Sequence, residues 1–103
     1  MLLTNAFSLN MVASFPVSPR FTEINVEEAR KLLAAGFESG VGHADTAAIF
    51  AEQLGIDVPA NRITVALKPG DVAVVGQYRG PRLPEGCHVL PEGATIQWIK
   101  LEM

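Results

Sequence analysis

Residues 37–54 constrain the fold most strongly, because an apolar strand there runs directly into an amphipathic helix. Phe37–Val41 predicts a short strand, and the helix is expected from about Ala44 to Leu54. The apolar residues of that helix recur at helical spacing, and Gly55 ends it; they are Ala47, Phe50, Ala51 and Leu54. His43 therefore lies beside the free backbone N–H groups of a helix N-terminus, where a phosphate ligand would be well placed.

The rest of the chain alternates between strand and helix patterns. Asn25 is a good N-cap, and Glu28 completes a capping box for the first helix. Further strands are expected at Leu2–Ser8, Arg20–Ile24, Arg62–Leu67, Asp71–Tyr78 and Thr95–Leu101. We therefore expect an α/β fold of the α+β type, with a mixed sheet of about five strands and helices packed on it. Residues 1–103 are expected to form a single small domain.

Composition excludes several classes of protein. The chain is 49% hydrophobic and 18% charged, which predicts a folded domain rather than a disordered one. The formal net charge of −3 argues against duplex DNA as a partner, and no apolar run is long enough to span a membrane. The single Cys87 fits a reducing cytoplasm. Two histidines and one cysteine, well separated, make a poor metal set, so we expect chemistry that needs no metal and no cofactor.

His43 is open to two interpretations. A histidine after a glycine is commonly a loop residue or a helix cap. Histidine as a residue type can also donate or accept a proton near neutral pH, which suits a catalytic group beside a phosphate. Residue spacing alone favours the first interpretation.

Four other segments carry polar residues beside sharp backbone features. Asn5 and Ser8 could contact phosphates or base edges, or could simply end a strand and cap a loop. Arg62 and Gln77 could contact a ligand, or could be a surface charge and an ordinary edge residue. In residues 82–86, an arginine and a glutamate three positions apart could bind a phosphate. They could instead form an exposed ion pair that contributes little to stability. Arg79 has no defined place, and His88 is expected to be a surface or core residue.

The segments together resemble one family more than any of them does alone. The pattern comprises Asn5–Met11, Gly42–Ala47, Asn61–Ile63, a Pro-Gly-Asp turn, and Gln77 followed by Arg82–Gly86. It resembles the viral ring nucleases that act as anti-CRISPR proteins against type III systems, together with their mobile-element and host-encoded relatives. The resemblance covers residues 2 to about 90.

The resemblance implies an activity, a partner and a site. Proteins of that family bind cyclic tetra-adenylate across a homodimer interface, cleave it without a metal, and so switch off type III CRISPR signalling. It implies that His43 is catalytic, with Arg82 and Glu85 as a supporting pair. The positions matching ligand-contacting residues are Asn5, Ser8, Asn10, Thr46, Arg62 and Gln77. A dimer that sequesters the ring without cutting it stays open as the alternative.

Overall fold

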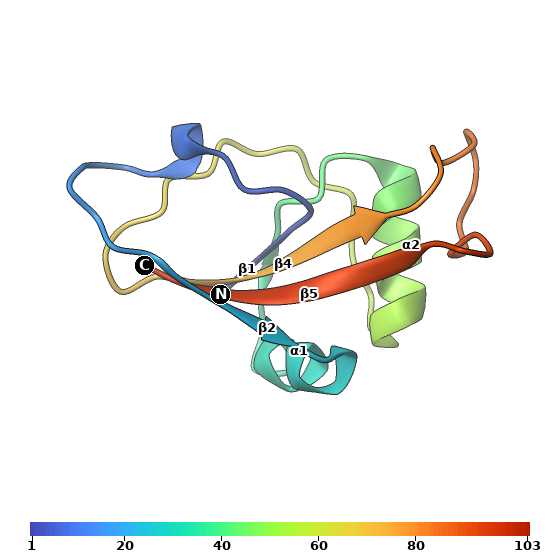
Figure 1. Cartoon of the computed structure of the whole chain (residues 1–103), viewed down its shortest axis with the longest axis horizontal. Helices are drawn as coiled ribbons and strands as arrows, with labels where there is room; N and C mark the ends of the chain where they lie inside the picture. Colours follow the sequence, from blue (N-terminus) through green and yellow to red (C-terminus); the bar gives the residue numbers. More distant parts are fainter.

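The computed structural model describes residues 1–103 and contains five strands and two α-helices (Figure 1). In chain order the elements are β1 (Leu2–Thr4), a short 3₁₀ helix (Leu9–Met11), β2 (Arg20–Ile24), α1 (Val26–Leu33), β3 (Glu38–Ser39), α2 (Ala44–Leu54), β4 (Val72–Arg79) and β5 (Thr95–Glu102). Neither helix has the length and apolar character needed to cross a membrane.

The five strands form one mixed sheet, as the sequence predicts. Their order is β2-β5-β4-β1-β3, in which β1 pairs in parallel with β3 and β4, and β5 pairs antiparallel with β4 and β2. The carboxyl ends of β1, β3 and β4 consequently point toward the same edge of the sheet. In open α/β sheets, the loops at such an edge are where ligands bind.

The main core lies between the sheet and the two helices. Ten buried residues form it, and they come from both helices, from the strands and from the segments beside them; they are Leu3, Ala29, Leu33, Val41, Ala47, Phe50, Leu54, Val58, Val74 and Trp98. The rings of Phe50 and Trp98 pack with their centroids 5.0 Å apart. This contact brings α2 down onto the centre of the sheet.

The opposite face of the sheet is covered by irregular chain rather than by helices. Leu2, Ala73 and Leu101 lie in a second buried cluster on this face, closed by the loop after β1 and the segment before β4 (Figure 1). The cover is incomplete, because Phe21 of β2 is 51% exposed and stacks edge-on against Phe7 with ring centroids 5.4 Å apart.

The start of α1 and both ends of α2 are as the sequence predicts. The Asn25 side chain accepts from the Glu28 N–H at 2.8 Å, and Glu28 Oε1 accepts from the Asn25 N–H at 3.2 Å, so the capping box forms. At the other end of α2, Gly55 adopts a left-handed φ of 69°, and Arg30 Nε donates to the Leu54 carbonyl at 2.5 Å. Arg30 thereby ties α1 to the end of α2.

Three predicted strands are corrected by the structure. Arg62–Leu67 is not a strand: it pairs only through one isolated bridge, between Leu67 and Val12. β3 keeps only two residues and β1 only three, against the predicted Phe37–Val41 and Leu2–Ser8. β1 ends because the chain turns at Thr4, whose hydroxyl donates to the Ala6 carbonyl at 3.2 Å.

Candidate functional site

His43 lies at the junction of β3 and α2 and is the N-cap of α2. Its Nδ1 accepts from the Asp45 N–H at 3.2 Å, and its carbonyl accepts from the Ala47 N–H at 3.0 Å. The residue is exposed. Because Nδ1 accepts a hydrogen bond, the neutral ring carries its proton on Nε2. Capping therefore occupies one ring nitrogen and leaves Nε2–H available to a ligand.

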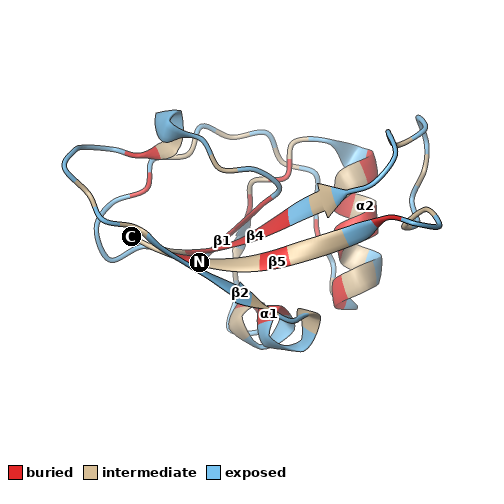
Figure 2. Cartoon of the chain, in the orientation of Figure 1, coloured by how far each residue is buried: buried red, intermediate tan, exposed pale blue.

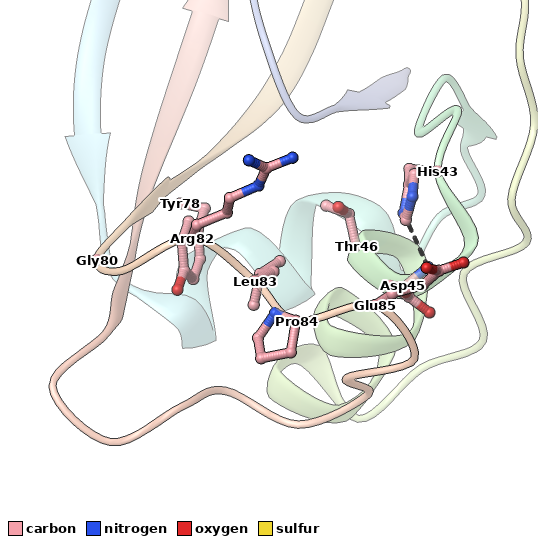
Figure 3. A pocket seen from close by; sticks show the side chains of 9 residues that line it. All are labelled: His43, Asp45, Thr46, Tyr78, Gly80, Arg82, Leu83, Pro84 and Glu85. Atoms are coloured by element: carbon pink, nitrogen blue, oxygen red, sulfur yellow. Dashed lines mark hydrogen bonds between the residues drawn. The ribbon is translucent and has the colours of Figure 1, made fainter.

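An open pocket of about 790 Å³ lies next to this junction (Figure 3). It is bounded by the first turn of α2, the end of β4 and the loop that follows β4. Its lining consists of His43, Asp45, Thr46, Tyr78, Gly80, Arg82, Leu83, Pro84 and Glu85. In the close view, Thr46 lies between the ring of His43 and the guanidinium of Arg82 (Figure 3). The structure thus gathers His43, Thr46, Arg82 and Glu85 around one cavity.

The two charged loop residues are unpaired. The ion pairs in the structure are His88 with Asp45 and Lys100 with Glu102, so Arg82 and Glu85 do not form the exposed ion pair that their spacing allowed. Both side chains are exposed at the pocket. A guanidinium without a protein partner can offer its full fork of donors to a phosphate.

Arg62 lies at the edge of this site. A Cβ placed on Gly42 would lie 3.5 Å from Arg62 Nε and 3.7 Å from its Cα, so Arg62 packs directly beside the residue before His43. Asn61 holds it there: its backbone N–H donates to the Val41 carbonyl at 2.7 Å, and its amide donates to the Ser39 carbonyl at 2.8 Å. A second cation therefore flanks the histidine.

Besides Arg62, four other predicted ligand contacts do not line the pocket. Asn5 and Ser8 are exposed in the loop after β1, and Asn10 is exposed in the 3₁₀ helix Leu9–Met11. Gln77 faces the side of the sheet away from the helices, where it lines a smaller hollow with Phe7 and Phe21, among other residues. Its amide hydrogen-bonds to Gln97 at 3.0 Å. The predicted residues are thus divided between the two faces of the sheet.

Sequence reasoning missed the roles of two residues in or beside the site, Asp45 and His88. Asp45 is buried, accepts from the Gly86 N–H at 2.8 Å, and lies 3.1 Å from His88 Nε2. An aspartate in a first helical turn is common, and no local pattern links it to a residue so far along the chain.

No group of three or more His, Cys, Asp or Glu suited to a metal ion occurs in the structure.

Comparison with known proteins identifies the family. A family model described as STIV B116-like matches residues 1–99. The chain belongs to this family. Among solved structures, B116 of Sulfolobus turreted icosahedral virus (STIV) matches with a TM-score of 0.82 and 26% sequence identity, covering 99% of this chain and 97% of that chain. A comparison with curated proteins found no match. The STIV B116-like match spans every residue of the pocket.

Proposed function

We propose that this protein is a ring nuclease that binds cyclic tetra-adenylate and cleaves it without a metal ion. The observation that carries the proposal is the meeting of His43, Thr46, Arg82 and Glu85 in one open pocket, although they come from two segments far apart in the sequence. Cleavage of the ring would remove the second messenger and so switch off type III CRISPR signalling.

The reaction can proceed with groups that the ligand itself supplies. Each linkage has a ribose 2′-hydroxyl beside its phosphorus, and this oxygen attacks in line. The O2′–P bond forms, the P–O5′ bond breaks, and the product ends in a 2′,3′-cyclic phosphate. The 2′-hydroxyl loses its proton to solvent water, and the leaving 5′-oxygen gains one from a general acid. Holding the attacking and leaving oxygens in line supplies much of the acceleration.

The pocket offers a group for each remaining task. His43 would protonate the leaving oxygen from Nε2 as an imidazolium, in which Nδ1 is also protonated and gives up its hydrogen bond with the Asp45 N–H. Arg82 and the N-terminus of α2 would stabilise the charge that develops on the phosphate oxygens. Glu85 would orient Arg82 or His43 when the ligand is bound. Arg62, beside Gly42, adds a second cation for a neighbouring phosphate.

The complete site would be formed by a homodimer. One chain with a net charge of −3 offers few cations for a ring with four phosphates. Two copies related by a two-fold axis would present each cation twice, and would present two copies of His43 to a ring of nearly matching symmetry.

A sequestering dimer is the second candidate, because helix capping accounts for His43 without any catalytic role. The experiment that separates the two incubates the protein with cyclic oligoadenylates of several ring sizes, denatures it, and resolves the products by chromatography. We expect linear fragments from cyclic tetra-adenylate. Recovery of the intact ring after tight binding would replace cleavage by sequestration, and absence of binding would end both proposals.

A further inference from the structure

Asp45 is the only charged residue in the buried part of the chain. It lies in the first turn of α2, and its carboxylate has two partners in the loop between β4 and β5. Oδ2 accepts from the Gly86 N–H at 2.8 Å, and Oδ1 lies 3.1 Å from Nε2 of His88. These partners are 41 and 43 residues away in sequence. A buried carboxylate needs such partners, because leaving it unpaired is costly.

The loop depends on this contact in turn. Most of residues 80–93 are exposed (Figure 2), and their other hydrogen bonds stay within the loop or join Pro81 to Tyr78 of the adjacent strand. The bonds to Asp45 are the ones that tie the middle of the loop to α2. Arg82 and Glu85 lie on the stretch between Tyr78 and Gly86, so its far end is fixed through Asp45.

Asp45 also contacts the histidine on its other side. Its backbone N–H donates to Nδ1 of His43 at 3.2 Å, which selects the tautomer with Nε2 protonated (Figure 3). One residue thus engages His43 through its main chain, and the loop that carries Arg82 and Glu85 through its side chain.

We propose that Asp45 is a positioning residue, whose carboxylate sets the loop so that Arg82 and Glu85 face His43 and Thr46 across the pocket. The inference rests on the proposed function for the roles of those four residues. It adds that the active arrangement depends on a group that need not touch the ligand. Misplacement of catalytic groups by about 1 Å can cost about 100-fold in rate.

The competing explanation is that Asp45 only stabilises α2. An acidic residue in a first turn interacts favourably with the helix dipole, whether or not a loop contacts it. That role predicts that substitution of Asp45 lowers the stability of the protein. In the folded variant, the position of the loop and the rate of cleavage would then be unchanged.

The test compares Asp45→Ala and Asp45→Asn with Asp57→Ala, which removes an exposed carboxylate after the end of α2. His88→Ala is added because its side chain is 65% exposed, so this variant should fold and loses only one of the two loop contacts. Two quantities are measured for each: hydrogen exchange of the Gly86 amide in the free protein, and the single-turnover cleavage rate separately from the dissociation constant for cyclic tetra-adenylate.

For Asp45→Ala we expect faster exchange at Gly86 and cleavage slowed by about 10- to 100-fold, with the dissociation constant changed by less than about fivefold. Asp45→Asn should restore most of the rate, because its amide oxygen still accepts from the Gly86 N–H. His88→Ala should change both quantities in the same direction by a smaller factor, and Asp57→Ala should change neither.

An unchanged hydrogen-exchange rate of the Gly86 amide in folded Asp45→Ala would overturn the inference. Cleavage by this variant at the wild-type rate would overturn it as well. A wild-type protein that binds but never cleaves would instead remove the proposed function. The exchange measurement would then still decide whether Asp45 holds the loop, since it needs no ligand.

Discussion

At the residue scale, the structural role of His43 and its proposed catalytic role can be separated. Nδ1 caps α2, and Nε2 is available at the pocket. A cap needs only a side-chain acceptor, which asparagine also provides, whereas proton donation to a leaving oxygen near neutral pH needs the imidazole. A matched pair of substitutions at this one position therefore distinguishes structure from chemistry.

We expect His43→Ala to lose both roles and His43→Asn to lose only the second. His43→Ala should lower the free energy of unfolding by about 0.5–2 kcal/mol, the usual cost of a lost N-cap, and His43→Asn should restore it. Both variants should bind the ring and cleave it about 10²- to 10⁴-fold more slowly, since general acid catalysis is gone. Chemical denaturation and single-turnover kinetics measure the two effects. Cleavage by His43→Asn at more than about a tenth of the wild-type rate would show that His43 is not the acid.

A second prediction at this scale concerns the reacting phosphate. In the proposed mechanism the nucleophile is the ligand's own 2′-hydroxyl, so cleavage should persist in excess EDTA, and the products should carry a 2′,3′-cyclic phosphate. A ring with hydrogen in place of each 2′-hydroxyl should bind and stay intact. Mass spectrometry identifies the products. Loss of activity with chelator, rescue by Mg²⁺, and a plain terminal phosphate would indicate attack by metal-bound water instead.

At the element scale, the placement of α2 on the sheet decides where its N-terminus and His43 lie. Phe50 and Trp98 pack over Gly76 of β4 so closely that no side chain fits there: a Cβ would lie 2.6 Å from Phe50 Cζ and 2.7 Å from Trp98 Cζ3. Arg30 fixes the other end of the helix through the Leu54 carbonyl. The absence of a side chain at Gly76, two residues before the pocket residue Tyr78, thus lets Phe50 of α2 pack this close to the sheet.

We expect Gly76→Ala to lower the free energy of unfolding by about 1–3 kcal/mol, because the methyl group would overpack the core. A second substitution, Phe50→Leu, removes the nearer ring and should make the alanine less costly than it is alone. Denaturation curves of the two single variants and the double variant give the coupling. Additive losses would show that the Phe50 ring does not exclude a side chain at position 76.

At the scale of the whole molecule, one face of the sheet is left partly uncovered. Phe7, Phe21 and Ile99 lie around a hollow of about 240 Å³ on the side away from the helices. Exposed apolar surface of this kind commonly marks a contact with another protein. Gln77, Arg79 and Gln97 form a hydrogen-bonded group next to it, which would give such a contact polar partners.

We therefore expect a homodimer in solution that uses this face. Light scattering should give twice the chain mass of 11.0 kDa, both free and with the ring bound. Phe21→Glu should shift the protein toward monomer, because it places a charge in the apolar contact. Glu27→Gln, on an exposed position of α1, is the control. A monomer that binds one ring per chain would contradict the dimeric site.

The sequence determined the elements whose signals are local. Asn25 with Glu28, and Gly55, fix helix ends through bonds and backbone angles within a few residues, and the alternation in β5 sets which of its side chains face the helices. The histidine at a helix N-terminus followed from the same local signals. The prediction of a strand at Arg62–Leu67 is wrong, because residues with high β-propensity do not show whether a neighbouring strand is free to pair with the segment.

Only the tertiary structure decided which distant residues share a site. It placed Arg82 and Glu85 across a pocket from His43, put Gln77 on the other face of the sheet, and joined Asp45 to Gly86. No spacing rule predicts these pairings, since they depend on where the β4–β5 loop folds after the sheet has formed. The helix N-terminus and its histidine could be predicted from the sequence because they depend on local hydrogen bonds. The residues that lie across the pocket from them were determined by long-range packing.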